Sequence, residues 1–69
     1  LMMKFNFSRA LKRAQETKGV RSIDLARHLG VHRQQVTRWR SQSDARVSLC
    51  CKICGALELE LLDFMEMGK

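Results

Sequence analysis

Proline is absent from this chain of 69 residues, which contains four glycines and a single tryptophan. A chain without proline in which 45% of the residues are hydrophobic is neither collagen-like nor disordered. No apolar run approaches the roughly 18 residues of a membrane span, and the start lacks the apolar segment of a signal peptide. We therefore expect a cytoplasmic protein that makes no membrane contact.

The length predicts one domain over residues 1–69, close to the size at which a chain buries only about 60% of its unfolded surface. Neither an internal repeat nor a low-complexity linker marks a second domain. Leu1 precedes the paired Met2 and Met3, so residues 1–5 are interpreted as a flexible start or a remnant of cloning.

Groups that could carry chemistry are also scarce. Cys50, Cys51 and Cys54 form a CCxxC pattern, but a redox site needs a βαβ setting that the sequence does not predict. A zinc site needs about four converging ligands, and His28 and His32 fall on different predicted elements. The spacing of Cys50 and Cys54 on one apolar stripe favours buried, reduced thiols. The sequence therefore predicts no enzyme, metal site, cofactor or small-molecule substrate.

Charge is distributed unevenly along the chain. Residues 1–52 contain twelve Lys and Arg against three acidic residues, a net charge of +9, whereas residues 53–69 contain one Lys against four acidic residues, a net charge of −3. A basic body with an acidic end is typical of a protein that places one face on DNA and keeps another away from phosphate. A basic surface that is merely solvated explains the charge alone equally well.

A helix-turn-helix pattern at residues 22–41 decides between these alternatives in favour of DNA. Ala26 is small where two helices would cross at close range, and Gly30 suits the left-handed conformation that ends the first of them. An apolar wedge would fix the steep angle between the two helices. Its members are Leu25, Leu29, Val31, Val36 and Trp39.

Apolar periodicity predicts an all-α protein, a compact bundle of about five short helices. Gly19 should end the first helix, Ser22 should cap the second, and Ser43 or Asp44 should cap the fourth. The alternation of Leu and Glu at residues 57–61 would also suit an edge strand, but Leu, Glu and Met favour helix. The predicted helices cover residues 7–18, 23–29, 33–41, 45–57 and 60–67.

The predicted helix at residues 33–41 separates apolar from polar side chains. Val36 and Trp39 point inward, and the opposite face carries residue types that hydrogen-bond to base edges in the major groove. The predicted base-reading residues are Arg33, Gln34, Thr37 and Arg38. Of these, Arg33 and Gln34 are the strongest candidates, because the N-terminal part of such a helix meets the bases. Weaker candidates for base or phosphate contacts are His32, Gln35 and Ser41.

Other polar residues around the motif are predicted to hold the phosphate backbone, which positions a protein without reading sequence. Arg21 precedes the second helix, and Arg46 follows the loop after the third. Ser22 and the free N–H groups of the helix that starts there form an anion site. Lys12 and its basic neighbours on the first helix are less specific, since solvated helix faces look the same.

These residues resemble the lambda repressor/Cro-type family of helix-turn-helix proteins, often called the XRE family, over about residues 7–65. The resemblance implies a bundle of five short helices and a phage or bacterial transcription regulator that binds operators as a dimer, at the nucleoid of a bacterial or phage-infected cell. The residues that carry it are Leu11, Gly19, Leu25, Ala26, Leu29, Gly30, Val31, the run from Val36 to Trp39, the run from Lys52 to Cys54, Ala56 and Leu57.

Three places depart from the family pattern. Ser22 stands where the family usually has a Gln that braces the first recognition residue against a phosphate. Gln15 and Arg40 stand where many members pair an Arg with a Glu, so that pair is absent as a unit and Arg40 is free to face phosphate. Glu58 replaces the usual Gly after the fourth helix, and we expect a differently built corner there.

Two functions stay open from the sequence. The first is a sequence-specific operator binder that acts as a repressor or a Cro-like switch. The second is a protein-interaction module on the same fold, such as an antitoxin. An antitoxin normally needs an extra toxin-binding segment, and this chain has almost no residues outside the predicted bundle.

Apolar residues between 57 and 67 cover more than one helical face, so one stripe would stay exposed unless two copies pair about a twofold axis. Such a homodimer would set two recognition helices about 34 Å apart on a near-palindromic duplex. The alternative is that all of these residues fold into the monomer core. The predicted interface residues are Leu59, Leu62, Phe64 and Met65.

Overall fold

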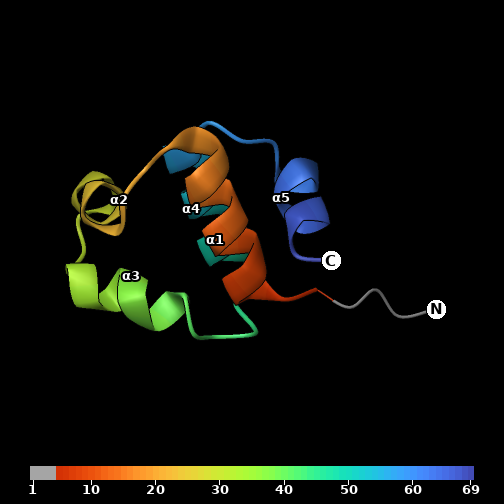
Figure 1. Cartoon of the computed structure of the whole chain (residues 1–69), viewed down its shortest axis with the longest axis horizontal. Helices are drawn as coiled ribbons and strands as arrows, with labels where there is room; N and C mark the ends of the chain where they lie inside the picture. Colours follow the sequence, from red (N-terminus) through yellow and green to blue (C-terminus); the bar gives the residue numbers. More distant parts are fainter. Residues whose placement is uncertain (1–4) are drawn as a thin grey trace.

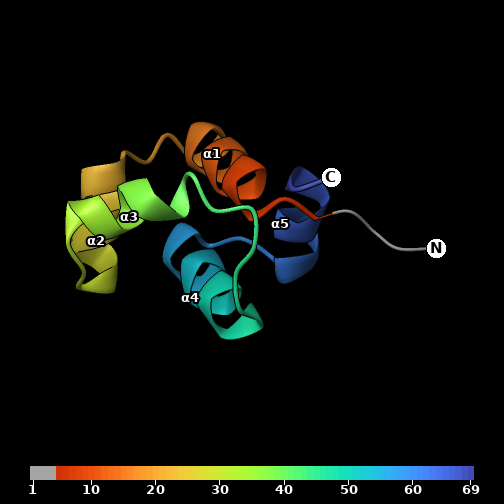
Figure 2. The ribbon, with the colours of Figure 1, turned by 90° about the horizontal axis from the view of Figure 1, so that it is seen from below.

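The computed structural model describes residues 5–69, and these residues form five α-helices and no strand. Figure 1 shows α1 and α4 in the middle of the molecule, with α2 and α3 at one end and α5 at the other. The view from below in Figure 2 gives the same arrangement. The helices are α1 (Phe7–Lys18), α2 (Ser22–Leu29), α3 (Arg33–Trp39), α4 (Val47–Leu57) and α5 (Leu61–Met67).

Helix α1 forms where the sequence predicts it and has a defined cap at each end. The side chain of Asn6 accepts a hydrogen bond from the backbone N–H of Arg9, which satisfies one of the free donors of the first turn. Gly19 ends the helix with a left-handed backbone at φ 65°. The helix buries one apolar stripe, so it can pack against α3, α4 and α5. The buried apolar residues are Phe7, Ala10, Leu11 and Ala14.

The predicted turn between the two motif helices is confirmed at Gly30, which has a φ of 69°. The predicted cap at Ser22 is wrong, because Ser22 is the first helical residue and Arg21 precedes it without a side-chain hydrogen bond to the helix. Water can accept hydrogen bonds from the free N–H groups at this surface helix start, so a side-chain cap is not required. Helix α3 ends at Trp39, earlier than the predicted residue 41.

The second half of the chain is helical, so the alternative of an edge strand near residues 57–61 is wrong. Helix α4 starts after Arg46, which makes no side-chain cap, so the predicted cap at Ser43 or Asp44 is also wrong. The Asp44 side chain accepts instead from the backbone N–H of Ala45, which orders the loop before the helix. None of the described helices has both the length and the apolar character that crossing a bilayer requires.

The core is closed by an aromatic cluster at the α5 end. Phe64 is fully buried, with ring centroids 6.1 Å from Phe5 and 6.2 Å from Phe7. The N–H of Asn6 donates to the carbonyl of Gly68 at 2.8 Å. Phe5 therefore packs on the core, and the prediction that it belongs to a flexible start is wrong. Residues 1–4, which were included in that prediction, lie outside the described residues.

Glu58 occupies the corner between α4 and α5 in a left-handed conformation, with a φ of 55°. Its backbone N–H donates to the carbonyl of Gly55 and that of Leu59 donates to Cys54, as in a helix end closed by glycine. The expectation of a differently built corner is therefore wrong. An L side chain at such a φ costs about 1–2 kcal/mol that glycine avoids.

Replacing Glu58 by Gly is therefore expected to stabilise the protein. The relief of strain exceeds the added entropy of the unfolded chain, and we expect the free energy of unfolding to rise by about 0.5–1 kcal/mol. Urea denaturation followed by circular dichroism measures the change. Glu60→Gly is the control, because it removes the same charge at an extended φ of −72°. Equal effects of the two substitutions would contradict strain at Glu58.

Candidate nucleic-acid interface

Helix α3 presents an apolar face to the core and a polar face to solvent. Val36 is fully buried and Trp39 is 7% exposed. His32 precedes the helix as its N-cap and is exposed, and Gln35 is half-buried. The exposed residues of the outward face are Arg33, Gln34, Thr37 and Arg38, and Ser41 is exposed two residues after the helix ends.

Two hydroxyl groups on this face are already engaged as donors. Thr37 Oγ1 donates to the carbonyl of Arg33 at 3.2 Å, and Ser41 Oγ donates to the carbonyl of Arg38 at 2.9 Å. Their oxygens keep free lone pairs, so toward a base edge they would act first as acceptors. Arg33, Gln34 and Arg38 supply the exposed donors.

Gln35 lies on another side of α3 from the exposed face. It lines a hollow of about 490 Å³ between α3 and the start of α4, together with Trp39, Gln42 and Arg46. Arg46 is exposed and lies immediately before α4. The structure thus brings Arg46 beside α3, although six residues lie between it and the end of that helix.

Arg21 is not a free cation at the start of α2. Its guanidinium contacts the carboxylate of Asp24 at 3.1 Å on the exposed surface. The hydrogen bond from Arg21 lowers the pKa of Asp24 from its ordinary value, and the same pair raises the pKa of Arg21. Asp24 therefore competes with any phosphate for this side chain.

Arg40 is also held within the protein. Its guanidinium donates to the side-chain oxygen of Gln15, and Arg40 is half-buried. The Arg–Glu ion pair is absent as expected, but Arg40 is not left free, because a hydrogen bond from its guanidinium to the neutral amide of Gln15 links the two positions. Sequence reasoning treated Gln15 only as a departure. Its place on the apolar stripe of α1, one helical turn after Leu11, was the signal that it is buried.

A cleft of about 630 Å³ lies beside this pair, lined from α1, the α1–α2 turn, the start of α2 and Arg40. It brings the predicted phosphate residues Arg21, Ser22 and Arg40 together. Lys12 joins them from α1, and Glu16 is the one acidic residue that lines the cleft.

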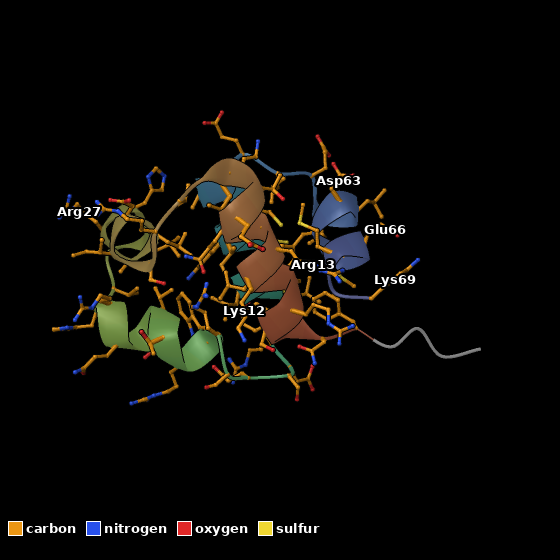
Figure 3. The ribbon with its side chains drawn as sticks, in the orientation of Figure 1. Lys12, Arg13, Arg27, Asp63, Glu66 and Lys69 are labelled. Carbon is orange, nitrogen blue, oxygen red and sulfur yellow. The ribbon has the colours of Figure 1, made fainter. Side chains whose placement is uncertain are left out.

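The acidic end of the chain lies away from these groups. Figure 3 shows Asp63 and Glu66 on α5, at the end of the molecule opposite α2 and α3. Glu66 pairs with Lys69 at 3.0 Å on the surface. At the α5 end these acidic side chains lie among Arg9, Arg13 and Lys69, so the positive excess of the protein is concentrated toward α2 and α3.

The predicted interface residues on and near α5 do not form one exposed patch. Phe64 is fully buried, so its assignment to an interface between copies is wrong. Leu59 is half-buried and packs against the core, and Met65 is half-buried. Leu62 alone is widely open, with 80% of its surface exposed.

The prediction that Cys50 and Cys54 are buried thiols is confirmed, and Cys51 is exposed. Burial raises the pKa of Cys54 to about 11 and also raises the pKa of Cys50. Both thiols therefore stay protonated and unreactive at neutral pH. Among residues 5–69, no three His, Cys, Asp or Glu side chains are grouped so that they could hold a metal ion.

Comparison with known proteins adds no assignment, since neither a protein-family model nor a curated protein matches this sequence. The resemblance to lambda repressor/Cro-type proteins therefore rests on the residues of the sequence alone.

Proposed function

We propose that this protein is a sequence-specific regulator of transcription, of repressor or Cro-like type, that inserts α3 into the major groove of double-stranded DNA. The observation that carries the proposal is the exposed face of α3, whose Arg, Gln and Thr side chains are the types that recognise base edges. Val36 and Trp39 anchor the opposite face of the same helix in the core. A rigid support of this kind holds base-reading side chains in a defined register.

Charge supports the same orientation on DNA. The cleft with Arg21 and Arg40 lies at the end of the molecule that carries α3, and Arg46 lies beside α3. Asp63 and Glu66 lie at the opposite end (Figure 3). A phosphate backbone would therefore attract the α3 end more strongly than the α5 end, which orients the protein before contact.

A gel-shift assay with the promoter region of its own gene and unlabelled competitor DNA tests the proposal. A sequence-specific regulator binds the promoter fragment in the presence of excess random duplex. Equal competition by random DNA would contradict sequence specificity. Absence of binding to every duplex would overturn the proposal and favour the protein-interaction module.

Arg46→Ala is expected to change the salt dependence of DNA binding. Log affinity should fall linearly with log salt concentration, and loss of one phosphate contact should reduce that slope by about one. Fluorescence anisotropy of a labelled duplex between about 50 and 200 mM salt measures both slopes. Lys69→Ala removes a cation at the α5 end and serves as the control. An unchanged slope for Arg46→Ala would show that Arg46 makes no phosphate contact.

The proposal includes a homodimer that pairs the α5 ends of two copies. Leu62 supplies the exposed apolar contact, and Met65 lies one turn further along α5. Because α5 is remote from α3 (Figure 1), this contact leaves both recognition helices free for DNA. Twofold pairing is the commonest assembly of soluble homo-oligomers.

Leu62→Glu is therefore expected to dissociate the dimer without unfolding the monomer. It places a charge in the interface, while an 80% exposed position tolerates a polar side chain. Light scattering over a range of micromolar and higher concentrations gives the mass of both proteins. Val47→Glu is the control, since Val47 is 69% exposed but lies on α4. A wild-type protein that remains a monomer throughout would contradict the dimer.

A further inference from the structure

Gln15 is the one buried polar side chain among residues 5–69, with 5% of its surface exposed. Its amide faces three different parts of the fold. The oxygen accepts from the guanidinium of Arg40, and the nitrogen lies 3.2 Å from the carbonyl of Val20 and 3.4 Å from the hydroxyl oxygen of Ser22. Gln15 thus links α1 to the α1–α2 turn, to the first residue of α2 and to the residue after α3.

The direction of these bonds follows from the chemistry of the amide. Arg40 can only donate, so the oxygen of Gln15 must face it. The NH2 group must then face Val20 and Ser22, where both bonds require it to donate. Ser22 therefore accepts from Gln15 through its oxygen, and its own proton stays free for another acceptor.

The cleft described above consequently offers donors. Arg40 uses one N–H on Gln15 and keeps its other guanidinium donors, and Ser22 keeps its O–H. Lys12 adds an ammonium group from α1, and Figure 3 shows Lys12 on the part of α1 nearest the end of α3. Glu16 is the one acidic residue of the lining, against Lys12 and Arg40, while Arg21 is already paired with Asp24. Hydroxyl and cationic donors with an excess of positive charge match an anion.

We infer that this cleft binds a phosphate group and that Gln15 is the positioning residue that sets Arg40 and Ser22 for it. The inference rests on the proposed function to the extent that the phosphate belongs to the DNA backbone. An inorganic phosphate ion has the same chemistry, and the experiment distinguishes the two sources. Gln15 itself donates into the fold rather than to the ligand, so it acts only through Arg40 and Ser22.

The first measurement uses inorganic phosphate and needs no DNA. In 15N-labelled protein, phosphate added at constant ionic strength should shift the amide signals of Ser22 and Ile23 and the Nε–H signal of Arg40. Arg40→Met should abolish these shifts. Arg27→Met is the matched control, because Arg27 is an exposed arginine that points away from α3 on the same helix as Ser22 (Figure 3).

The second measurement is the salt dependence of duplex binding. Arg40→Met should reduce the slope of log affinity against log salt by about one, and Arg27→Met should leave it unchanged. Gln15→Met keeps the side-chain volume but removes all three side-chain hydrogen bonds, so it should reduce the slope in the wild-type background. Its further effect in the Arg40→Met background should be much smaller, since only Ser22 is then left for Gln15 to position.

Gln15→Glu covers the case in which Gln15→Met fails to fold. A carboxylate can still accept from Arg40, but it cannot donate to Ser22, and its charge offsets that of Arg40. We expect this variant to lose the phosphate response and to bind duplex DNA with a reduced salt slope. Thermal unfolding of each variant identifies those that are folded. A purely structural role for Gln15 would change the unfolding midpoint and leave the slope of the folded variant at the wild-type value.

The outcomes separate this inference from the proposed function. A reduced slope for Arg40→Met without a response to free phosphate assigns the site to the DNA backbone and supports the inference. A phosphate response in a protein that binds no duplex overturns the proposed function and leaves the anion site standing. Duplex binding with a wild-type slope in both Arg40→Met and a folded Gln15 variant, and no response to phosphate, overturns the inference alone.

Discussion

Trp39→Ala is expected to destabilise the protein by about 3–5 kcal/mol, enough to unfold much of the population of so small a domain. Trp39 is the last residue of α3 and is 7% exposed within the common core. Helix α3 packs on α2 and on α1, so the indole lies where α3 joins the rest of the fold. Its removal leaves a cavity that the surrounding side chains fill only in part.

Thermal unfolding followed by circular dichroism measures this loss. Leu62→Ala is the control for removal of a large apolar side chain, and at 80% exposure it should change stability by less than about 0.5 kcal/mol. Trp39 is the single tryptophan, so fluorescence reports on its burial directly. We expect blue-shifted emission that acrylamide quenches poorly. A red-shifted, readily quenched indole in the wild-type protein would contradict the packing of α3.

Much of the fold could be predicted because its signals are local. The stripe of α1 and the glycines at positions 19 and 30 each lie within one element or one turn, and the structure confirms them. The failures at Ser22, Ser43 and Asp44 concern helix starts on the surface, where water satisfies free N–H groups and no side chain is needed.

Other features could not be predicted because their partners are distant in the sequence. Phe64 is buried by Phe5 and Phe7, from the opposite end of the chain, so periodicity within α5 could not decide whether its apolar stripe faces the core or a second copy. The contact between Gln15 and Arg40 spans 25 positions. Neither residue alone indicates the other, since an amide and an arginine pair without the strong preference of opposite charges. The outward face of α3 was predictable because it lies opposite Val36 and Trp39, two apolar residues of the same helix that point into the core.

Arg33→Ala and Gln34→Ala are each expected to weaken binding to the preferred duplex by about 1–3 kcal/mol and to relax the base preference at the position that each side chain reads. Both residues are exposed in the first turn of α3, the part of a recognition helix that reaches base edges. Neither side chain anchors the core, so the variants should keep the stability of the wild-type protein.

Selection from a random duplex library gives the preferred site, and anisotropy then compares it with a scrambled duplex. Arg27→Ala and Gln42→Ala are the matched controls, since both positions are exposed and lie outside the α3 face. The α3 substitutions should lower affinity for the preferred duplex far more than for the scrambled one, because non-specific binding depends on phosphate contacts made elsewhere. The salt dependence of DNA affinity should fall in Arg33→Ala only if the guanidinium of Arg33 also contacts a phosphate in the wild-type protein. Wild-type ratios between the two duplexes in both variants would show that α3 does not read the sequence.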